Sequence, residues 1–153
     1  MFGLFNKKTE SYFSDEEKQQ IVDAIKRAEQ RTSGEVRIYV ERRCRFVNPV
    51  MRAKEVFDAL KMTETAARNG VLVYLAMKDR QLAVFGDEGI HAKVGNEFWN
   101  KEVEKMLAHF NRENYAQGIT QMIHQIGEAL TTHFPYDGAT DKNELPDDIV
   151  FGR

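Results

Sequence analysis

The sequence predicts a single α/β domain, a three-layer α/β/α sandwich whose small mixed sheet is built in the order α-β-α-β-β-α-α. Residues 35–41 alternate apolar and polar side chains, as a strand with one wetter face does. A helical pattern then leads to the continuously apolar residues 70–77, which is typical of a strand covered on both faces. A tight turn joins this run to a third strand, residues 80–85, and two amphipathic helices follow. A chain of 153 residues fits one such domain.

The helices are predicted from caps and apolar spacing. Ser14 and Glu17 form a capping box that opens the first helix. Asn48 and Pro49 are a cap and a preferred first helical residue, so a second helix should run from there to near Met62. The last two helices are marked by apolar residues at helical spacing, namely Phe98, Trp99, Val103, Met106, Leu107 and Phe110, then Tyr115, Ile119, Met122, Ile123, Ile126 and Leu130.

Composition excludes several classes of protein. With 22 basic and 24 acidic residues the net charge is −2, whereas a nucleic-acid-binding domain carries a basic excess. The single cysteine, Cys44, cannot form an internal disulfide, and the first ten residues lack the apolar core of a secretory signal. No segment is long enough to span a bilayer. We therefore expect a cytoplasmic protein that neither binds nucleic acid nor inserts into a membrane.

The order of the elements predicts which loops meet. A right-handed crossover through the second helix makes the first two strands parallel, and the tight turn makes the third strand antiparallel to the second. The third strand therefore ends where the first two begin. This places residues 86–89 at the same edge of the sheet as residues 32–35 and 68–70.

Carboxylates gather at this predicted edge. Glu35, Asp87 and Glu88 would meet there, beside the amide of Asn69 and the hydroxyls of residues 32–33. Such an all-oxygen set suits a divalent cation, with calcium expected first and magnesium as the alternative, whereas zinc favours Cys and His ligands. The structural alternative is that Asp87 caps the helix that begins near Glu88.

The opposite edge is predicted to be basic. Residues 41–46 and the turn at residues 78–80 together contribute Arg42, Arg43, Arg45, Lys78 and Arg80. This edge lies beyond the carboxyl ends of the parallel strands, where ligands of open α/β sheets usually bind. The pattern fits an anion or phosphate site, and equally a solvated basic loop that answers nearby acids.

Several segments together resemble the TPM domain family of bacterial and thylakoid-lumen proteins. They read TSGEVRIYVE, RNGVLVYLA, FGDEGI, FWNKEVEKML and FNRENYAQGITQMIHQIGEAL. The resemblance divides the chain into an extension, residues 1–13, a TPM-like domain, residues 14–134, and an acidic tail, residues 135–153, which resembles a soluble branch of the family. The apolar end of that tail, residues 149–151, is a candidate for docking on the body of the domain.

What the resemblance implies is an α/β/α sandwich, divalent-cation binding in some members and an acid phosphatase activity in others. Many members carry an aspartate immediately before the Asn-Gly that opens the second strand, where this chain has Arg68. Members are commonly exported and anchored beside membrane complexes. Glu35 and the glycines at positions 70 and 86 match the family pattern.

Three functions follow as hypotheses. The first is binding of a divalent cation, with Glu35, Asp87 and Glu88 as ligands. The second is a metal-dependent phosphatase, in which Asp87 is the residue to test and Arg68 is the only nearby cation that could hold phosphate. The third is a noncatalytic module that binds a protein partner through the sandwich surface or the docked tail.

Overall fold

The structure is a computed structural model that describes residues 12–45, 48–111, 114–136 and 148–152. Its elements are, in chain order, α2 (Asp15–Glu29), β1 (Glu35–Glu41), α3 (Pro49–Ala59), β2 (Gly70–Ala76), β3 (Gln81–Gly86), α4 (Glu88–Asn111), α5 (Tyr115–His133) and β4 (Ile149–Phe151). The α/β sandwich predicted from the sequence is confirmed. The apolar end of the tail docks on the body as β4.

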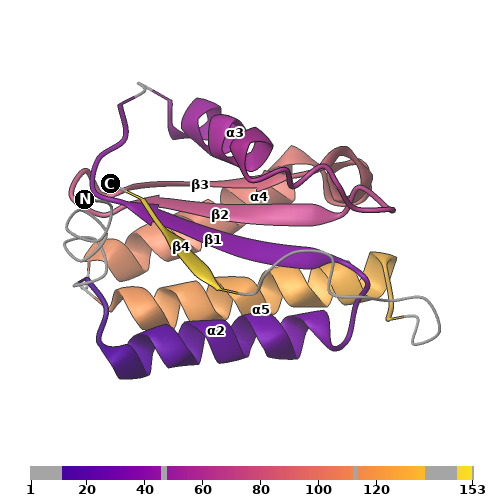
Figure 1. The fold of residues 1–153 in the computed structure, drawn as a ribbon, viewed down its shortest axis with the longest axis horizontal. Coiled ribbons are helices and arrows are strands. Elements are labelled where there is room, and N and C mark those ends of the chain that lie inside the picture. Colours follow the sequence, from indigo (N-terminus) through magenta and orange to yellow (C-terminus); the bar gives the residue numbers. More distant parts are fainter. Residues whose placement is uncertain (1–11, 46–47, 112–113, 137–147, 153) are drawn as a thin grey trace.

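The sheet has the strand order β3-β2-β1-β4. β1 pairs in parallel with β2 over the full length of both strands, from Glu35 opposite Gly70 to Glu41 opposite Ala76. β3 is antiparallel to β2, and β4 is parallel to β1. Figure 1 shows α3 on one face of this sheet and α2 and α5 on the other, and α4 shares the hydrophobic core of α2 and α5. The predicted strand directions are therefore correct.

Each face of the sheet covers a separate hydrophobic core. Every residue of β2 is buried, because its side chains alternate between the two cores. On the side of α2, α4 and α5 the strands contribute Val36, Ile38, Val40, Val71, Val73, Leu75, Leu82 and Val84. On the side of α3 the buried strand residues are Leu72, Tyr74, Ala76 and Ala83. The uninterrupted apolar pattern of residues 70–76 is thus explained by burial on both faces.

Two boundaries differ from the sequence prediction. α3 ends at Ala59, before the expected Met62, because Lys61 adopts the left-handed conformation with φ of 57°. The turn before β3 is longer than expected: the N–H of Arg80 donates to the carbonyl of Met77, and the strand starts at residue 81. α4 begins at residue 88, where the sequence places a helix start, and is interrupted at Gly95, whose φ of 76° is not helical.

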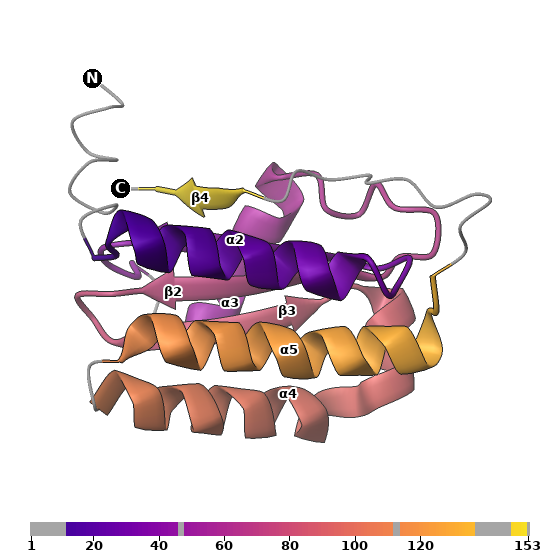
Figure 2. The same cartoon turned by 90° about the horizontal axis from the view of Figure 1, so that it is seen from below.

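α5 lies between α2 and α4 and packs against both (Figure 2). Two glycines permit the close approach. A Cβ atom at Gly118 would lie 2.6 Å from the Cβ of His109 in α4, and one at Gly127 would lie 2.8 Å from the Cβ of Ala28 in α2. Within the described ranges, no helix is long and apolar enough to cross a membrane.

The packing predicts the effect of a cavity in the core on the α5 side. Ile123 of α5 is fully buried there. We expect Ile123→Ala to lower the free energy of unfolding by about 2–5 kcal/mol, through lost transfer energy and an unfilled cavity. The measurement is urea unfolding followed by circular dichroism. Gln125→Ala, at an exposed position of the same helix, is the matched control and should change stability by less than about 0.5 kcal/mol.

Candidate functional site

Three loops meet at the edge of the sheet where β1 and β2 begin. The N–H of Glu35 donates to the carbonyl of Asn69 over 3.4 Å, and the N–H of Asp87 donates to the carbonyl of Gly70 over 2.9 Å. Residues 33–35, 68–70 and 86–89 are therefore neighbours, and we call them the acidic edge. The juxtaposition predicted from strand order is confirmed.

Arg68 lies among the carboxylates of this edge. Its guanidinium makes a two-point ion pair with Asp87, from Nε to Oδ2 over 2.7 Å and from Nη2 to Oδ1 over 2.8 Å. A third nitrogen, Nη1, lies 3.1 Å from Oε1 of Glu88. The hydrogen bonds to Asp87 and the two negative charges raise the pKa of Arg68. The side chain of Asp87 is 4% exposed, so the ion pair is shielded on the side of the carboxylate.

Asp87 also bonds the start of α4. Its Oδ1 accepts the N–H of Glu88, the first residue of the helix, over 2.8 Å, whereas a helix cap accepts the N–H of the second or third residue. The start of α4 is held against the loop before β2, because the N–H of Gly89 donates to the carbonyl of Arg68 over 2.8 Å. A Cβ atom at Gly89 would lie 2.2 Å from the carbonyl oxygen of Ala67. Only glycine fits this approach, which fixes Asp87 next to Arg68.

Two further polar side chains of the acidic edge are buried. Glu35 is 2% exposed and Asn69 is 1% exposed. The amide nitrogen of Asn69 donates to the hydroxyl of Ser33 over 3.3 Å, whereas its Oδ1 has no hydrogen-bond partner among the described residues. A buried oxygen without a partner costs free energy, and it is an acceptor open to a cation or a water.

The structure brings the predicted ligands together only in part. Asp87 and Glu88 share one guanidinium, and Glu35 begins the neighbouring strand opposite Gly70. Across the described part of the chain, no three His, Cys, Asp or Glu side chains form a group that could hold a metal ion. Sequence reasoning placed Arg68 here but assigned it to phosphate. The sequence did contain an indication of the ion pair, since Arg68 stands in a loop that was predicted to lie beside Asp87 and Glu88.

At the opposite edge of the sheet, two carboxylates lie among the basic residues that the sequence places there. Asp79 of the turn before β3 accepts the N–H of Cys44 over 2.9 Å and lies 3.8 Å from Arg43. The strand end itself is occupied by Glu41, which is 6% exposed. Nε and Nη2 of Arg52 in α3 bond the two oxygens of this carboxylate over 2.8 and 2.9 Å, and the Tyr74 hydroxyl donates to it as well.

This network predicts a pH-dependent stability. Burial first, and then the hydrogen bond to Glu41, raise the pKa of Tyr74. The folded state therefore keeps the phenol proton where the unfolded chain loses it, above about pH 10. The contribution of Tyr74 to the free energy of unfolding is therefore fully present below about pH 10. It falls as the pH rises further.

Tyr74→Phe is the matched test, because Arg52 still holds Glu41 in the variant. We expect the variant to lose about 1.5–3 kcal/mol at neutral pH, as for a hydrogen bond to a charged group. The difference between wild type and variant should shrink as urea unfolding is repeated from about pH 9 upward. A difference that stays constant across this range would show that Tyr74 does not titrate differently in the two states.

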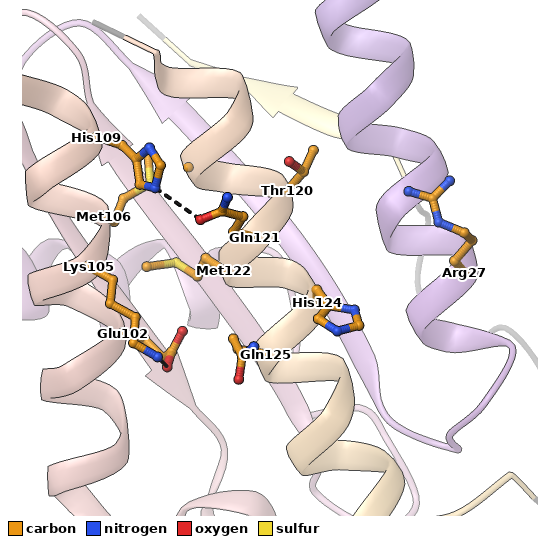
Figure 3. A pocket seen from close by; sticks show the side chains of 11 residues that line it. Arg27, Glu102, Lys105, Met106, His109, Thr120, Gln121, Met122, His124 and Gln125 are labelled. Carbon is orange, nitrogen blue, oxygen red and sulfur yellow. Dashed lines mark hydrogen bonds and ion pairs between the residues drawn. The ribbon is translucent and has the colours of Figure 1, made fainter. Parts of the chain in front are cut away.

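A pocket of about 430 Å³ lies along α5, with lining residues from α2 and α4. In Figure 3, Met106 and Met122 lie between α4 and α5, and His109 points toward Gln121, with Nε2 3.0 Å from Oε1. Glu102 is bonded to Lys105 over 3.1 Å. The lining, all within the described residues, contains no serine or cysteine. Two pairs of its polar groups bond each other, Glu102 with Lys105 and His109 with Gln121, and no unpartnered buried side-chain oxygen or nitrogen of the described residues lies in the lining, so the acidic edge remains the better candidate site.

The fold and the edge define a class: a three-layer α/β/α domain with a mixed four-stranded sheet and acidic loops where the parallel strands begin. The model of the TPM domain family matches residues 7–129, and the chain belongs to this family. The predicted resemblance is thereby confirmed. A comparison with curated protein sequences gave no match.

Solved structures agree with this assignment. The chain is similar to the BA42 protein of the psychrophilic bacterium Bizionia argentinensis, solved by NMR, with 38% identity and a TM-score of 0.83. That likeness covers 92% of this chain and 95% of BA42. The N-terminal domain of the cg2496 protein of Corynebacterium glutamicum has 15% identity and a TM-score of 0.57, over 77% of this chain and 74% of that one. The second likeness concerns the fold alone.

Proposed function

We propose that this TPM domain binds a divalent cation at the acidic edge, and that Arg68 competes with the ion for the same carboxylates. The observation that carries the proposal is the convergence of Asp87 and Glu88 on one guanidinium. A positive charge is already held at this point by oxygens from the start of α4. A divalent ion would offer the same carboxylates a higher charge in a smaller volume.

The remaining donors also support a hard cation. The Oδ1 atom of Asn69 is buried with no hydrogen-bond partner in the described ranges, and the buried Glu35 opens the adjacent strand. Carboxylate and amide oxygens are ligands that calcium accepts in flexible geometry. Magnesium is the weaker candidate, because it requires a stricter octahedron and gives up its waters reluctantly.

Arg68 is placed so that it can leave. Its side chain is 39% exposed, whereas the Asp87 side chain that it bonds is 4% exposed. Its backbone has φ of 52°, a conformation that is uncommon for residues other than glycine and asparagine. Rotation of the guanidinium into solvent would free Asp87 and Glu88 while leaving the backbone bond to Gly89 in place.

The contacts of Arg68 favour cation binding over hydrolysis of a phosphate ester at this edge. The phosphatase hypothesis required Arg68 to hold phosphate, and in the structure this guanidinium is bonded to Asp87 and Glu88. No separate observation in the described residues favours a second cation for that role.

The proposal predicts opposite effects at two neighbouring residues. Arg68→Asn removes the competing charge and suits the left-handed backbone, so calcium affinity should rise on the order of tenfold. Asp87→Asn keeps a side-chain oxygen that can accept the N–H of Glu88 but removes the charge, so calcium binding should be lost. Isothermal titration calorimetry with calcium chloride measures both, and melting temperature with and without calcium is an independent readout.

Arg43→Gln is the matched control, because it removes an arginine at the opposite edge of the sheet and should leave calcium binding unchanged. Equal calcium affinity in wild type, Arg68→Asn and Asp87→Asn would contradict the proposal. Magnesium chloride in the same titration decides between the two ions.

A further inference from the structure

The C-terminal segment, residues 148–152, lies along β1 as the edge strand of the sheet. Ile149 to Phe151 pair in parallel with Ile38 to Val40, and the N–H of Gly152 donates to the carbonyl of Val40 over 2.7 Å. Figure 1 shows this short strand beside β1, on the side away from β2. An added edge strand gains affinity from its main-chain hydrogen bonds, whatever its sequence.

Two side chains of the segment contact the face of the sheet that α2, α4 and α5 cover. Ile149 and Phe151 pack against the core shared by α2, α4 and α5, although each residue remains half-buried. The ammonium group of Lys18 in α2 lies 5.6 Å from the centre of the Phe151 ring, within the range of a cation–π contact. An aromatic residue at position 151 is therefore favoured over an aliphatic one.

The other face of β1 sets two further requirements. A Cβ atom at Gly152 would lie 2.0 Å from the hydroxyl oxygen of Tyr39 and 2.5 Å from Cζ of the same ring, so a side chain at this position requires the Tyr39 ring to move. Asp148 precedes the strand, next in register to Arg37, which is 8% exposed. The negative charge of Asp148 acts against the desolvation that lowers the pKa of Arg37.

We propose that the outer edge of β1 is a peptide-docking site for an extended segment of the pattern acidic, Ile or Val, any residue, aromatic, Gly. The protein's own residues 148–152 are its resident ligand, and a partner protein that presents the same pattern replaces them. The site consists of β1 with Lys18 and is independent of cation binding at the acidic edge.

The resident strand is suited to exchange. It is three residues long, all three of its residues are half-buried, and no further strand among the described residues pairs with its outer edge. Such elements open at the low end of the range of local unfolding energies. Because the tail belongs to the same chain, its effective concentration at the site is in the millimolar range, and it should mask the site from weak ligands.

The test releases the tail within the full-length chain. Phe151→Asp places a charge where the ring packs, and should free the edge of β1. The probe is a fluorescent peptide of residues 147–153, DDIVFGR, followed by anisotropy. We expect the variant to bind the probe at least about tenfold more tightly than wild type, because the competing tail is removed. Gly152→Val in the full-length chain is a second route to the same released state.

Matched peptides test the recognition pattern. The probe with Val in place of Gly152 should not bind the Phe151→Asp variant, because of the clash with Tyr39, and Tyr39→Ala in that variant should restore its binding. The probe with Asn in place of Asp148 should bind more weakly. Circular dichroism confirms that each variant is folded.

Two results would overturn the proposal. The first is equal binding of the probe to wild type and to both released variants. The second is a concentration-dependent dimer of the wild type that disappears in Phe151→Asp, since this would mean that two copies exchange their tails and no separate partner is involved.

Discussion

The parallel pairing of β1 with β2 is the constraint on which the rest of the structure depends. Because Glu35 lies opposite Gly70 and Glu41 lies opposite Ala76, both strands begin at one edge of the sheet and end at the other. The antiparallel return of β3 then delivers Asp87 to the edge where the parallel pair begins. A shift of this register would separate the loops that form the acidic edge, while leaving every helix able to form.

Each end of the parallel pair holds a buried carboxylate that is neutralised by an arginine from outside the strands. Arg68 forms an ion pair with Asp87 at one end, and Arg52 forms one with Glu41 at the other. The two pairs differ in access: the Arg52 side chain is 22% exposed and its carboxylate also accepts the Tyr74 hydroxyl, whereas the Arg68 side chain is 39% exposed. Replacing the cation therefore costs least at the acidic edge, although open α/β sheets usually bind ligands at the other end.

Sequence patterns were sufficient for the elements and their order, since burial on both faces makes residues 70–76 apolar and capping residues mark Ser14 and Asn48. Strand directions then followed from connection rules. Contacts between side chains did not follow, because they depend on rotamers and on helix placement. The Arg68–Asp87 pair needed the left-handed backbone of Arg68, and the Arg52–Glu41 pair needed the position of α3 over the sheet. Neither feature produces a periodic pattern in the sequence.

The two faces of β1 make different contacts, apolar on one side and polar on the other. This difference explains why β1 accepts only certain sequences in the strand beside it. Ile38 and Val40 face the core under α2 and α5, which Ile149 and Phe151 extend. Tyr39 faces the side of α3, where it stacks on Tyr74 and lies under the guanidinium of Arg52. The ring that excludes a side chain at residue 152 is thus held by the same network that neutralises Glu41. Packing on one face gives the edge strand its affinity, and the fixed polar residues on the other face restrict its sequence.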